Sequence, residues 1–324
     1  IRMVEINADT PCFIVESFYA NGVAAAYHGR RDPNAGTQAQ LRDFLTRIHN
    51  QLAAPIADLK RQTLTHRPFV FSCFDDYPED LATTRFLMEQ MQEGVPHGDI
   101  RFLSFYEMEI DDEGIPLIDS RYATALYRLH PMEILIDECT ADGEPLGALF
   151  LDLYKEGKFA LMNPPEAILL QNKSFMALVY ALARTEQFLT AEECALVRRY
   201  LVPSYFEEDF AALMDGTYIR KEIWGREGKN VRLVEKQGDH AKTVHEKQPD
   251  NADEIICRPS RAAMYQDFVR QPRFVHTVDS GTIDGCLTLS CFMLFDTPSA
   301  VGARFSPAEI AGTEAYFLPL VTGS

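Results

Sequence analysis

The chain has 324 residues, of which 46% are hydrophobic and 24% charged, so it can bury a sizeable core in one large multi-lobed domain or two. No apolar run approaches the roughly 18–20 residues that a bilayer-spanning helix needs, so we expect a soluble protein. The formal net charge of −17 disfavours non-specific binding to nucleic acid and would attract a cationic substrate such as a polyamine.

Seven cysteines occur singly, without a CxxC pair, which indicates reduced thiols and a cytoplasmic location. The sequence starts at Ile1 inside a strand-like segment and not at a methionine. We therefore expect that further residues precede it.

Residues 3–9 alternate between apolar and polar side chains, which predicts a strand with Glu5, Asn7 and Asp9 on its polar face. Carboxylate and amide oxygens are ligands that Mg²⁺ prefers, and waters and substrate phosphates usually complete its shell. The pattern predicts a metal site at Glu5 and Asn7. The polar face of an ordinary edge strand is the alternative.

Strand and helix patterns alternate through the first half, which favours an α/β fold. Strands are expected over residues 69–74, 100–106 and 122–126, and helices over 41–64 with a break near Pro55 and over about 75–91. Glu79 and Asp80 fall in the first turn of the second helix. Acids there commonly favour the helix dipole, but a strand end that leads into a helix is also where α/β sheets bind ligands.

Pro164 and Pro165 interrupt the chain and predict a boundary between a substrate- and metal-binding region, residues 1–163, and a nucleotide-binding region, residues 164–324. Lys173 begins a predicted helix that runs to about Arg184. Its charge adds to the positive end of the helix dipole, which is unfavourable unless an anion binds there. Strands are expected over residues 263–269, 274–278 and 287–295, and the first of them has Gln266 at an acceptor-rich centre.

A strand hairpin is predicted within residues 217–236, where the loop between two alternating runs contains Gly225 and Gly228. Glycine tolerates positive φ and leaves N–H groups uncovered, so this loop can wrap an anion such as a phosphate. Lys221 lies on the apolar face of the first strand, where its charge calls for an anion; a surface hairpin with a snorkelling lysine is the alternative. We expect a lid over about residues 215–255, with a mobile, polar tip at 236–254.

Five motifs together resemble the glutathionylspermidine synthase family, in the order that the family has them and over nearly the whole chain. They are residues 5–9, 127–133, 172–173, 221–231 and 302–304. The resemblance implies an α/β (α+β) protein with an ATP-grasp fold that follows a pre-ATP-grasp α/β region.

The resemblance also implies roles for particular residues. Glu5 and Asn7 match metal ligands, Lys173 and Lys221 match lysines on the ATP phosphates, and Arg304 matches an arginine near the transferred phosphoryl group. The expected nucleotide contacts further include Gly225, Arg226, Glu227, Gly228, Asn230 and Gln266, with Arg226 and Arg304 as catalytic residues, and the expected substrate contacts are Asp9, Thr10, Glu79 and Asp80. Glu79 and Asp80 stand where the family has an acidic pair that faces the polyamine.

Three departures from the family concern its substrates. An arginine and an aspartate of the family would lie before Ile1, Leu129 stands where the true synthases have a hydroxyl residue near glutathione, and there is no cysteine–histidine amidase domain. The ligase chemistry is unaffected by these differences, and the identity of the substrates stays open.

The sequence therefore predicts an ATP- and Mg²⁺-dependent acid–amine ligase that forms an amide through an acyl phosphate. Its expected partners are a peptide- or glutathione-like acid and an amine such as a polyamine, with a homodimer left open and with neither nucleic acid nor membrane. A phosphotransferase that stops at phosphorylation and a catalytically inactive nucleotide-binding homologue are the alternatives.

Overall fold

The computed structural model describes residues 1–52, 68–140, 142–226, 228–246, 262–278, 281–312 and 315–323. Contacts divide the chain into two units, each assembled from three separate segments. Unit 1 comprises Ile1–Ala8, Glu166–Thr288 and Arg304–Tyr316, and unit 2 comprises Asp9–Pro165, Leu289–Ala303 and Phe317–Ser324. Among the helices in the described ranges, none combines the length and apolar character that crossing a bilayer requires.

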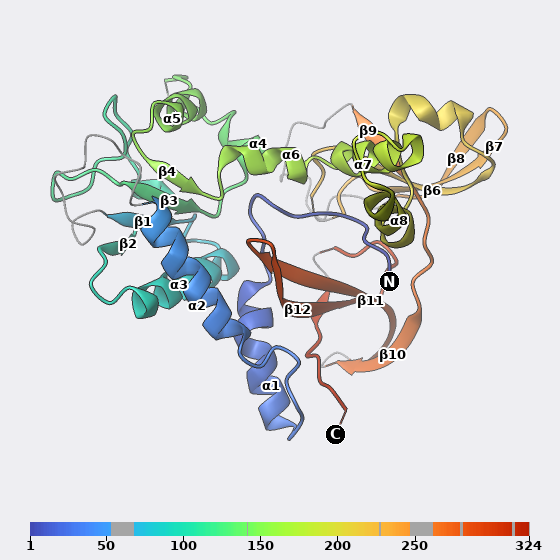
Figure 1. Ribbon diagram of the computed structural model, residues 1–324, viewed down its shortest axis with the longest axis horizontal. Coiled ribbons are helices and arrows are strands. Elements are labelled where there is room, and N and C mark those ends of the chain that lie inside the picture. Colours follow the sequence, from blue (N-terminus) through green and yellow to red (C-terminus); the bar gives the residue numbers. More distant parts are fainter. Residues whose placement is uncertain are drawn as a thin grey trace. The chain divides into compact units, whose positions relative to one another are not determined.

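A parallel four-stranded sheet forms the centre of unit 2, with the strand order β2-β1-β3-β4 (Figure 1). Its strands are β1 (Phe69–Ser72), β2 (Ile100–Phe102), β3 (Ala125–Arg128) and β4 (Ala160–Met162). Every residue of β1 and β3 is buried, as expected of central parallel strands that are covered on both faces. The predicted strands at 69–74, 100–106 and 122–126 are thus present with shifted ends.

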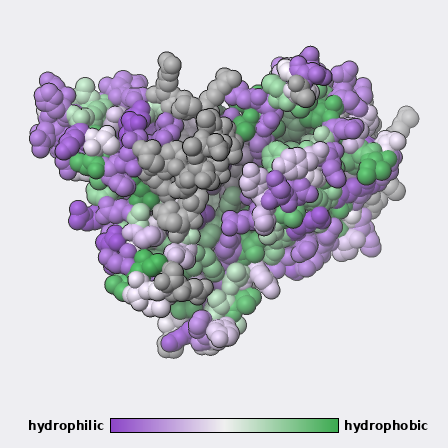
Figure 2. Space-filling view, turned by 180° about the vertical axis from the view of Figure 1, so that it is seen from behind, coloured by the Kyte–Doolittle hydropathy of each residue, from purple (hydrophilic) through white to green (hydrophobic). Residues whose placement is uncertain are grey.

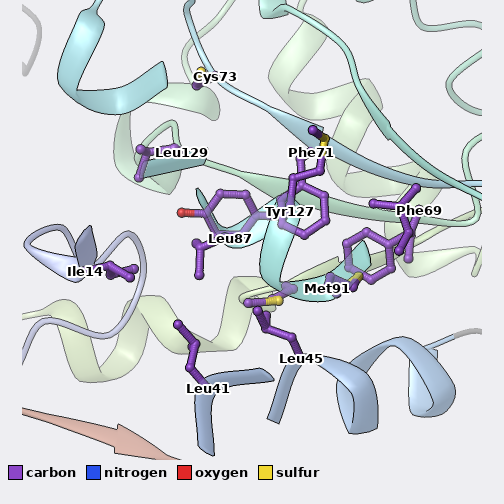
Figure 3. Close-up of a cluster of buried hydrophobic side chains, with 14 of the residues drawn as sticks. Ile14, Leu41, Leu45, Phe69, Phe71, Cys73, Leu87, Met91, Tyr127 and Leu129 are labelled. Atoms are coloured by element: carbon purple, nitrogen blue, oxygen red, sulfur yellow. The ribbon is translucent and has the colours of Figure 1, made fainter. Parts of the chain in front are cut away.

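The main core of unit 2 lies between this sheet and two helices, α2 (Thr37–Leu52) and α3 (Pro78–Gly94). Leu45 of α2 and Leu87 of α3 pack with Phe71 and Tyr127 of the sheet (Figure 3). Residues 53–64 of the first predicted helix lie outside the described residues. Unit 2 also contains the π-helix η1 (Glu16–Ala20), the 3₁₀ helix η4 (Phe105–Glu107), and α1 (Asn21–Tyr27), α4 (Met132–Leu135) and α5 (Leu146–Lys155).

Two long strands, β11 (Gly281–Leu294) and β12 (Thr297–Ser306), each contribute residues to both units. In unit 2, Phe292, Leu294 and Ala300 pack against the main core. In unit 1, the start of β11 pairs with β10 (Arg273–Val278) in an antiparallel hairpin. The sheet that contains these strands has the order β10-β11-β12-β13, with β13 at Tyr316–Phe317.

An antiparallel five-stranded sheet with the order β5-β9-β6-β7-β8 forms the centre of unit 1. Its strands are β5 (Ser204–Phe206), β6 (Gly216–Glu222), β7 (Arg232–Gln237), β8 (His240–Glu246) and β9 (Ala263–Asp267). The remaining helices are η5 (Pro165–Ala167) and α6 (Ile168–Gln171), then α7 (Ser174–Thr185), α8 (Ala191–Tyr200) and the 3₁₀ helix η6 (Glu207–Ala212). The predicted hairpin within residues 217–236 is the β6–β7 pair.

The first part of the lid tip predicted at residues 236–254 is a strand, and the predicted mobility of the tip stays a prediction. Residues 236–246 complete β7 and form β8, which pairs with β7 along its length. The side chains of β8 are mostly polar and mostly exposed, because an edge strand can be held by backbone pairing on one side without an apolar face. The polar composition therefore concealed a strand. Residues 247–254 lie outside the described residues.

The strand predicted over residues 3–9 is also wrong in its extent. Met3 pairs with Leu201 in an isolated parallel bridge, donating to the Tyr200 carbonyl and accepting from the Val202 N–H. Beyond it, the Val4 carbonyl accepts hydrogen bonds from the side chains of β6 and β9. Ile6 packs with buried residues of unit 1, so the segment is held by side chains and not by strand pairing.

Figure 2 shows hydrophilic and apolar side chains interspersed over one face of the molecule, as is usual for protein surfaces.

Candidate functional site

Lys221 projects from β6 toward the start of the chain. Its ammonium donates to Gln266 Oε1 at 2.9 Å and to the Val4 carbonyl at 3.3 Å. Burial lowers the pKa of Lys221 and the charge of Lys173 adds to that effect, while Glu5 opposes it. The structure therefore confirms a partly desolvated lysine on this strand, and its hydrogen-bond partners there are neutral oxygens.

Lys173 lies directly before α7, at the N-cap position. Its side chain is 13% exposed and lies 3.7 Å from Glu5, and its ammonium donates to the Gly225 carbonyl at 2.7 Å. The Lys173 backbone N–H donates to the Ile223 carbonyl at 3.0 Å. The start of α7 is thus tied to the loop that follows β6.

Three cations of unit 1 act on Glu5 through their charge. Its side chain is 53% exposed. Partial burial opposes ionisation, but the charges of Lys173, Lys221 and Arg304 outweigh it and lower the pKa of Glu5. Arg304 is exposed and belongs to β12.

The loop after β6 has positive φ at only one of its two glycines, Gly228, and also at Asn230. Gly228 and Asn230 have φ angles of 72° and 57°, and glycine and asparagine are the residues that adopt this left-handed region most readily. Within the loop, the Gly225 N–H donates to the Glu222 carbonyl and the Lys229 N–H to the Arg226 carbonyl. Glu227 lies outside the described residues.

Glu5 and Asn7 are both exposed and supply only oxygen ligands, a donor set that suits Mg²⁺. In the described ranges, no three His, Cys, Asp or Glu side chains gather as a metal-binding group. A Mg²⁺ ion held by Glu5 and Asn7 would therefore take its other ligands from water and phosphate oxygens.

Asp9 does not share a polar face with Glu5 and Asn7, because it is buried in unit 2. Its carboxylate accepts from Arg128 at 2.5 Å and from the Met132 N–H at 2.8 Å, and both charged side chains are fully buried. This ion pair joins residue 9 to the segment at 127–133. Thr10 is buried as well. The predicted substrate contacts of Asp9 and Thr10 stay predictions.

Glu79 and Asp80 lie in the first turn of α3, as predicted. The N-cap residue is Tyr77, and it makes no side-chain cap hydrogen bond. Glu79 is exposed and Asp80 half-buried. Burial, together with the nearby charges of Cys12 and Asp80, raises the pKa of Tyr127 well above its ordinary value.

A family model described as glutathionylspermidine synthase preATP-grasp matches residues 1–322. The chain belongs to this family. Among solved structures, it is similar to a glutathione synthetase-like effector, GSS30, from Globodera pallida in its apo form, with a TM-score of 0.52 and 11% identity. That match covers 98% of this chain and 70% of the other, and it concerns the fold alone. The ATP-grasp ligase PsnB, complexed with a minimal precursor, matches 79% of this chain and 89% of its own with a TM-score of 0.32 and 14% identity.

The predicted fold class of this glutathionylspermidine synthase family member is confirmed: it is a mixed α/β protein with parallel and antiparallel sheets, an ATP-grasp fold and a pre-ATP-grasp region. Unit 1 gathers Glu5, Lys173, Lys221, Gln266 and Arg304, which are distant in sequence. Unit 2 contains the other predicted group: Asp9, Thr10, Glu79 and Asp80.

Sequence reasoning missed Ser204 in this family member. Ser204 is buried in β5 and accepts a hydrogen bond from Gln266 Nε2 at 3.0 Å. A single serine between Pro203 and an aromatic strand offers no periodic or motif signal. Register alone brings it to the site, because Ser204 pairs with Gln266 across β5 and β9.

Proposed function

We propose that this protein is an ATP- and Mg²⁺-dependent acid–amine ligase. Membership of the glutathionylspermidine synthase family supports a ligase-type function. The observation that carries the finer proposal is the convergence of three cations, Lys173, Lys221 and Arg304, on the carboxylate of Glu5. Such a cluster suits a polyphosphate bound together with a metal, because phosphoryl transfer is catalysed mostly by positioning and charge neutralisation.

In the proposed reaction, an oxygen of the acid's carboxylate attacks the γ-phosphorus of ATP, and ADP leaves. The nitrogen of the amine then attacks the carbonyl carbon of the acyl phosphate, inorganic phosphate leaves, and the nitrogen loses a proton as the amide forms. Lys173 and Lys221 hold the phosphates, while Arg226 and Arg304 neutralise charge on the transferred group. Each of these steps needs cations and no protein nucleophile.

The loop and the metal segment complete the proposed nucleotide site. Mg²⁺, when bound by Glu5 and Asn7, neutralises phosphate charge. The proposed contacts of the loop are made by Gly225, Glu227, Gly228 and Asn230, and Gln266 belongs to the same site. The positive φ angles at Gly228 and Asn230 bring the backbone into a shape that can follow an anion.

The acids of unit 2 are proposed to serve the substrates. Glu79 and Asp80 stand after a buried parallel strand, at the edge where α/β sheets bind ligands, and they would pair with an ammonium group of the amine. Asp9 and Thr10 are assigned to the substrate side of residues 1–163, and residues 164–324 to the nucleotide side.

The test is ATP turnover with a set of acids and amines, supplied singly and together. A ligase sustains ADP release only when an acid and an amine are both present, and the amide appears in equal amount by mass spectrometry. ADP release with one substrate alone would instead indicate a phosphotransferase. ATP binding without turnover in the whole set would favour an inactive homologue.

A further inference from the structure

Two buried polar side chains, Gln266 and Ser204, are linked to Lys221 by hydrogen bonds. Gln266 and Ser204 are each 2% exposed. They are register partners across β9 and β5, and Ile219, two residues before Lys221, is the partner of Gln266 across β6. Register partners and alternate residues share one face of a sheet. The three side chains of Ser204, Gln266 and Lys221 therefore lie on the same face.

The hydrogen bonds among these groups have one consistent direction. Lys221 can only donate, so Gln266 Oε1 must be the oxygen that accepts from it at 2.9 Å. The Gln266 amide nitrogen then donates to the Val4 carbonyl at 3.2 Å and to Ser204 Oγ at 3.0 Å. Ser204 Oγ donates onward to the Val202 carbonyl at 2.8 Å. Every hydrogen-bonding atom of the Gln266 side chain is engaged.

The hydrogen-bond acceptors that fix the Lys221 ammonium group are both neutral, and Glu5 acts on it only through its nearby charge. A partly buried lysine is ordinarily paired with a carboxylate, but the hydrogen bonds that Lys221 donates go to a neutral carboxamide and the neutral Val4 carbonyl. The amide nitrogen of the same Gln266 side chain donates a hydrogen bond to the carbonyl of Val4, the residue before Glu5. One side chain thus sets the position of the lysine and of the backbone that carries the carboxylate.

We propose that Gln266 and Ser204 are positioning residues for the phosphate site. Gln266 acts through Lys221 and Val4 and does not need to touch the nucleotide, and Ser204 fixes the amide of Gln266 in the orientation that accepts from the lysine. The inference rests on the proposed nucleotide-binding function. It adds that the hydrogen-bond acceptors which hold Lys221 are neutral, so they carry no charge that would compete with a phosphate for the lysine.

The experiment is a double-mutant cycle with Mg²⁺–ATP binding measured by calorimetry. Ser204→Ala is made in the natural chain and in Lys221→Met, and Gln266→Glu is made in the natural chain. The matched control is Thr124→Val, which removes another buried hydroxyl that donates to a backbone carbonyl, that of Pro68. Thermal unfolding of each variant separates a general loss of stability from a loss of affinity.

Ser204→Ala is expected to weaken ATP binding about threefold to tenfold in the natural chain and by less than twofold in Lys221→Met, because its effect passes through the lysine. Gln266→Glu keeps the side chain's shape but neutralises Lys221, and should weaken binding tenfold or more. Thr124→Val should leave affinity unchanged. An equal effect of Ser204→Ala in both backgrounds, or no effect of either variant, would overturn the inference. Absence of ATP binding by the natural chain would instead overturn the proposed function on which it rests.

Discussion

The carboxylate of Glu5 lies 3.7 Å from the ammonium group of Lys173. The Glu5 carboxylate is thus paired with Lys173, which the proposed function assigns to the phosphates of ATP. A phosphate and Glu5 would compete for Lys173 unless a metal ion binds the carboxylate. Metal and nucleotide are then expected to bind with positive coupling.

Glu5→Gln tests this coupling. Without its charge, residue 5 no longer competes for Lys173, so metal-free ATP should bind about threefold to tenfold more tightly than it does to the natural chain. The same variant should need more Mg²⁺ for turnover, because an amide is a weaker ligand than a carboxylate. Calorimetry in excess chelator and a Mg²⁺ titration of activity measure the two effects. Identical metal-free affinities would argue against competition.

The lysines themselves give the second prediction. Lys173→Met and Lys221→Met should each weaken ATP binding about tenfold or more, equivalent to roughly 1.4 kcal/mol. Lys236→Met is the matched control. Lys236 is also a buried lysine of this sheet, but its ammonium donates to the Gly238 carbonyl in the turn between β7 and β8. Lys236→Met should bind ATP like the natural chain; if Lys173→Met and Lys221→Met do so as well, the phosphate assignment fails.

The ion pair of Asp9 and Arg128 gives a prediction about stability. Both side chains are fully buried, so removing one partner leaves an uncompensated charge, which costs about 3–5 kcal/mol. Arg128→Met should therefore lower the free energy of unfolding by that amount, and adding Asp9→Asn should recover part of it. Denaturant titration measures both. A loss of less than about 1 kcal/mol in Arg128→Met would show that the pair is open to solvent.

Glu79 and Asp80 give a prediction about the amine. Glu79→Gln with Asp80→Asn should raise the KM for the amine and leave the KM for ATP near its original value, and the difference should shrink with added salt. Because the acids can support α3 through its dipole, a stability loss of about 0.3–1 kcal/mol is expected as well. Asp76→Asn, next to the same helix start and bonded to Tyr106, is the control. Unaltered amine kinetics with lowered stability would decide for a helix-stabilising role alone.

His49 predicts how stability depends on pH. It is 2% exposed, and burial lowers its pKa from the ordinary value of 6.5, although a hydrogen bond with Asn50 opposes this. As the pH falls, the unfolded chain therefore takes up the proton on His49 before the folded chain does. His49 leaves the free energy of unfolding unchanged above about pH 6.5 and lowers it progressively as the pH falls below that value. His49→Gln should show a shallower loss of stability between pH 7 and 5 in denaturant titrations. Parallel curves for the two proteins would contradict this.

Local signals predicted much of this fold. Thr190 and Glu193 have the sequence spacing of a capping box, which predicts a helix start. Helix α8 begins there, and the side chain of Glu193 accepts from the Thr190 N–H at 2.8 Å. The glycine loop after β6 adopts positive φ at Gly228, as its composition indicates. In these cases the chemistry that fixes the structure lies within a few neighbouring residues.

Contacts between residues that are far apart in the sequence could not be predicted from local patterns. No residue near Asp9 in the sequence indicates that Asp9 will form a buried ion pair with Arg128. The alternation of residues 3–9 indicates a strand, but the Val4 carbonyl is taken by Lys221 and Gln266. Ser204 reaches the site only through the pairing of β5 with β9. Such positions depend on tertiary register, which a single sequence does not express.

The chain passes from one unit to the other five times between Ala8 and Phe317. No contiguous fragment can therefore contain one unit whole without most of the other. A fragment of residues 1–163 would lack Phe292, Leu294 and Ala300, which complete the packing around its sheet, and a fragment of residues 164–324 would lack Ile6, which packs with Met176 and Met264. Each fragment expressed by itself would expose apolar surface and should aggregate, while the two expressed together could complement each other.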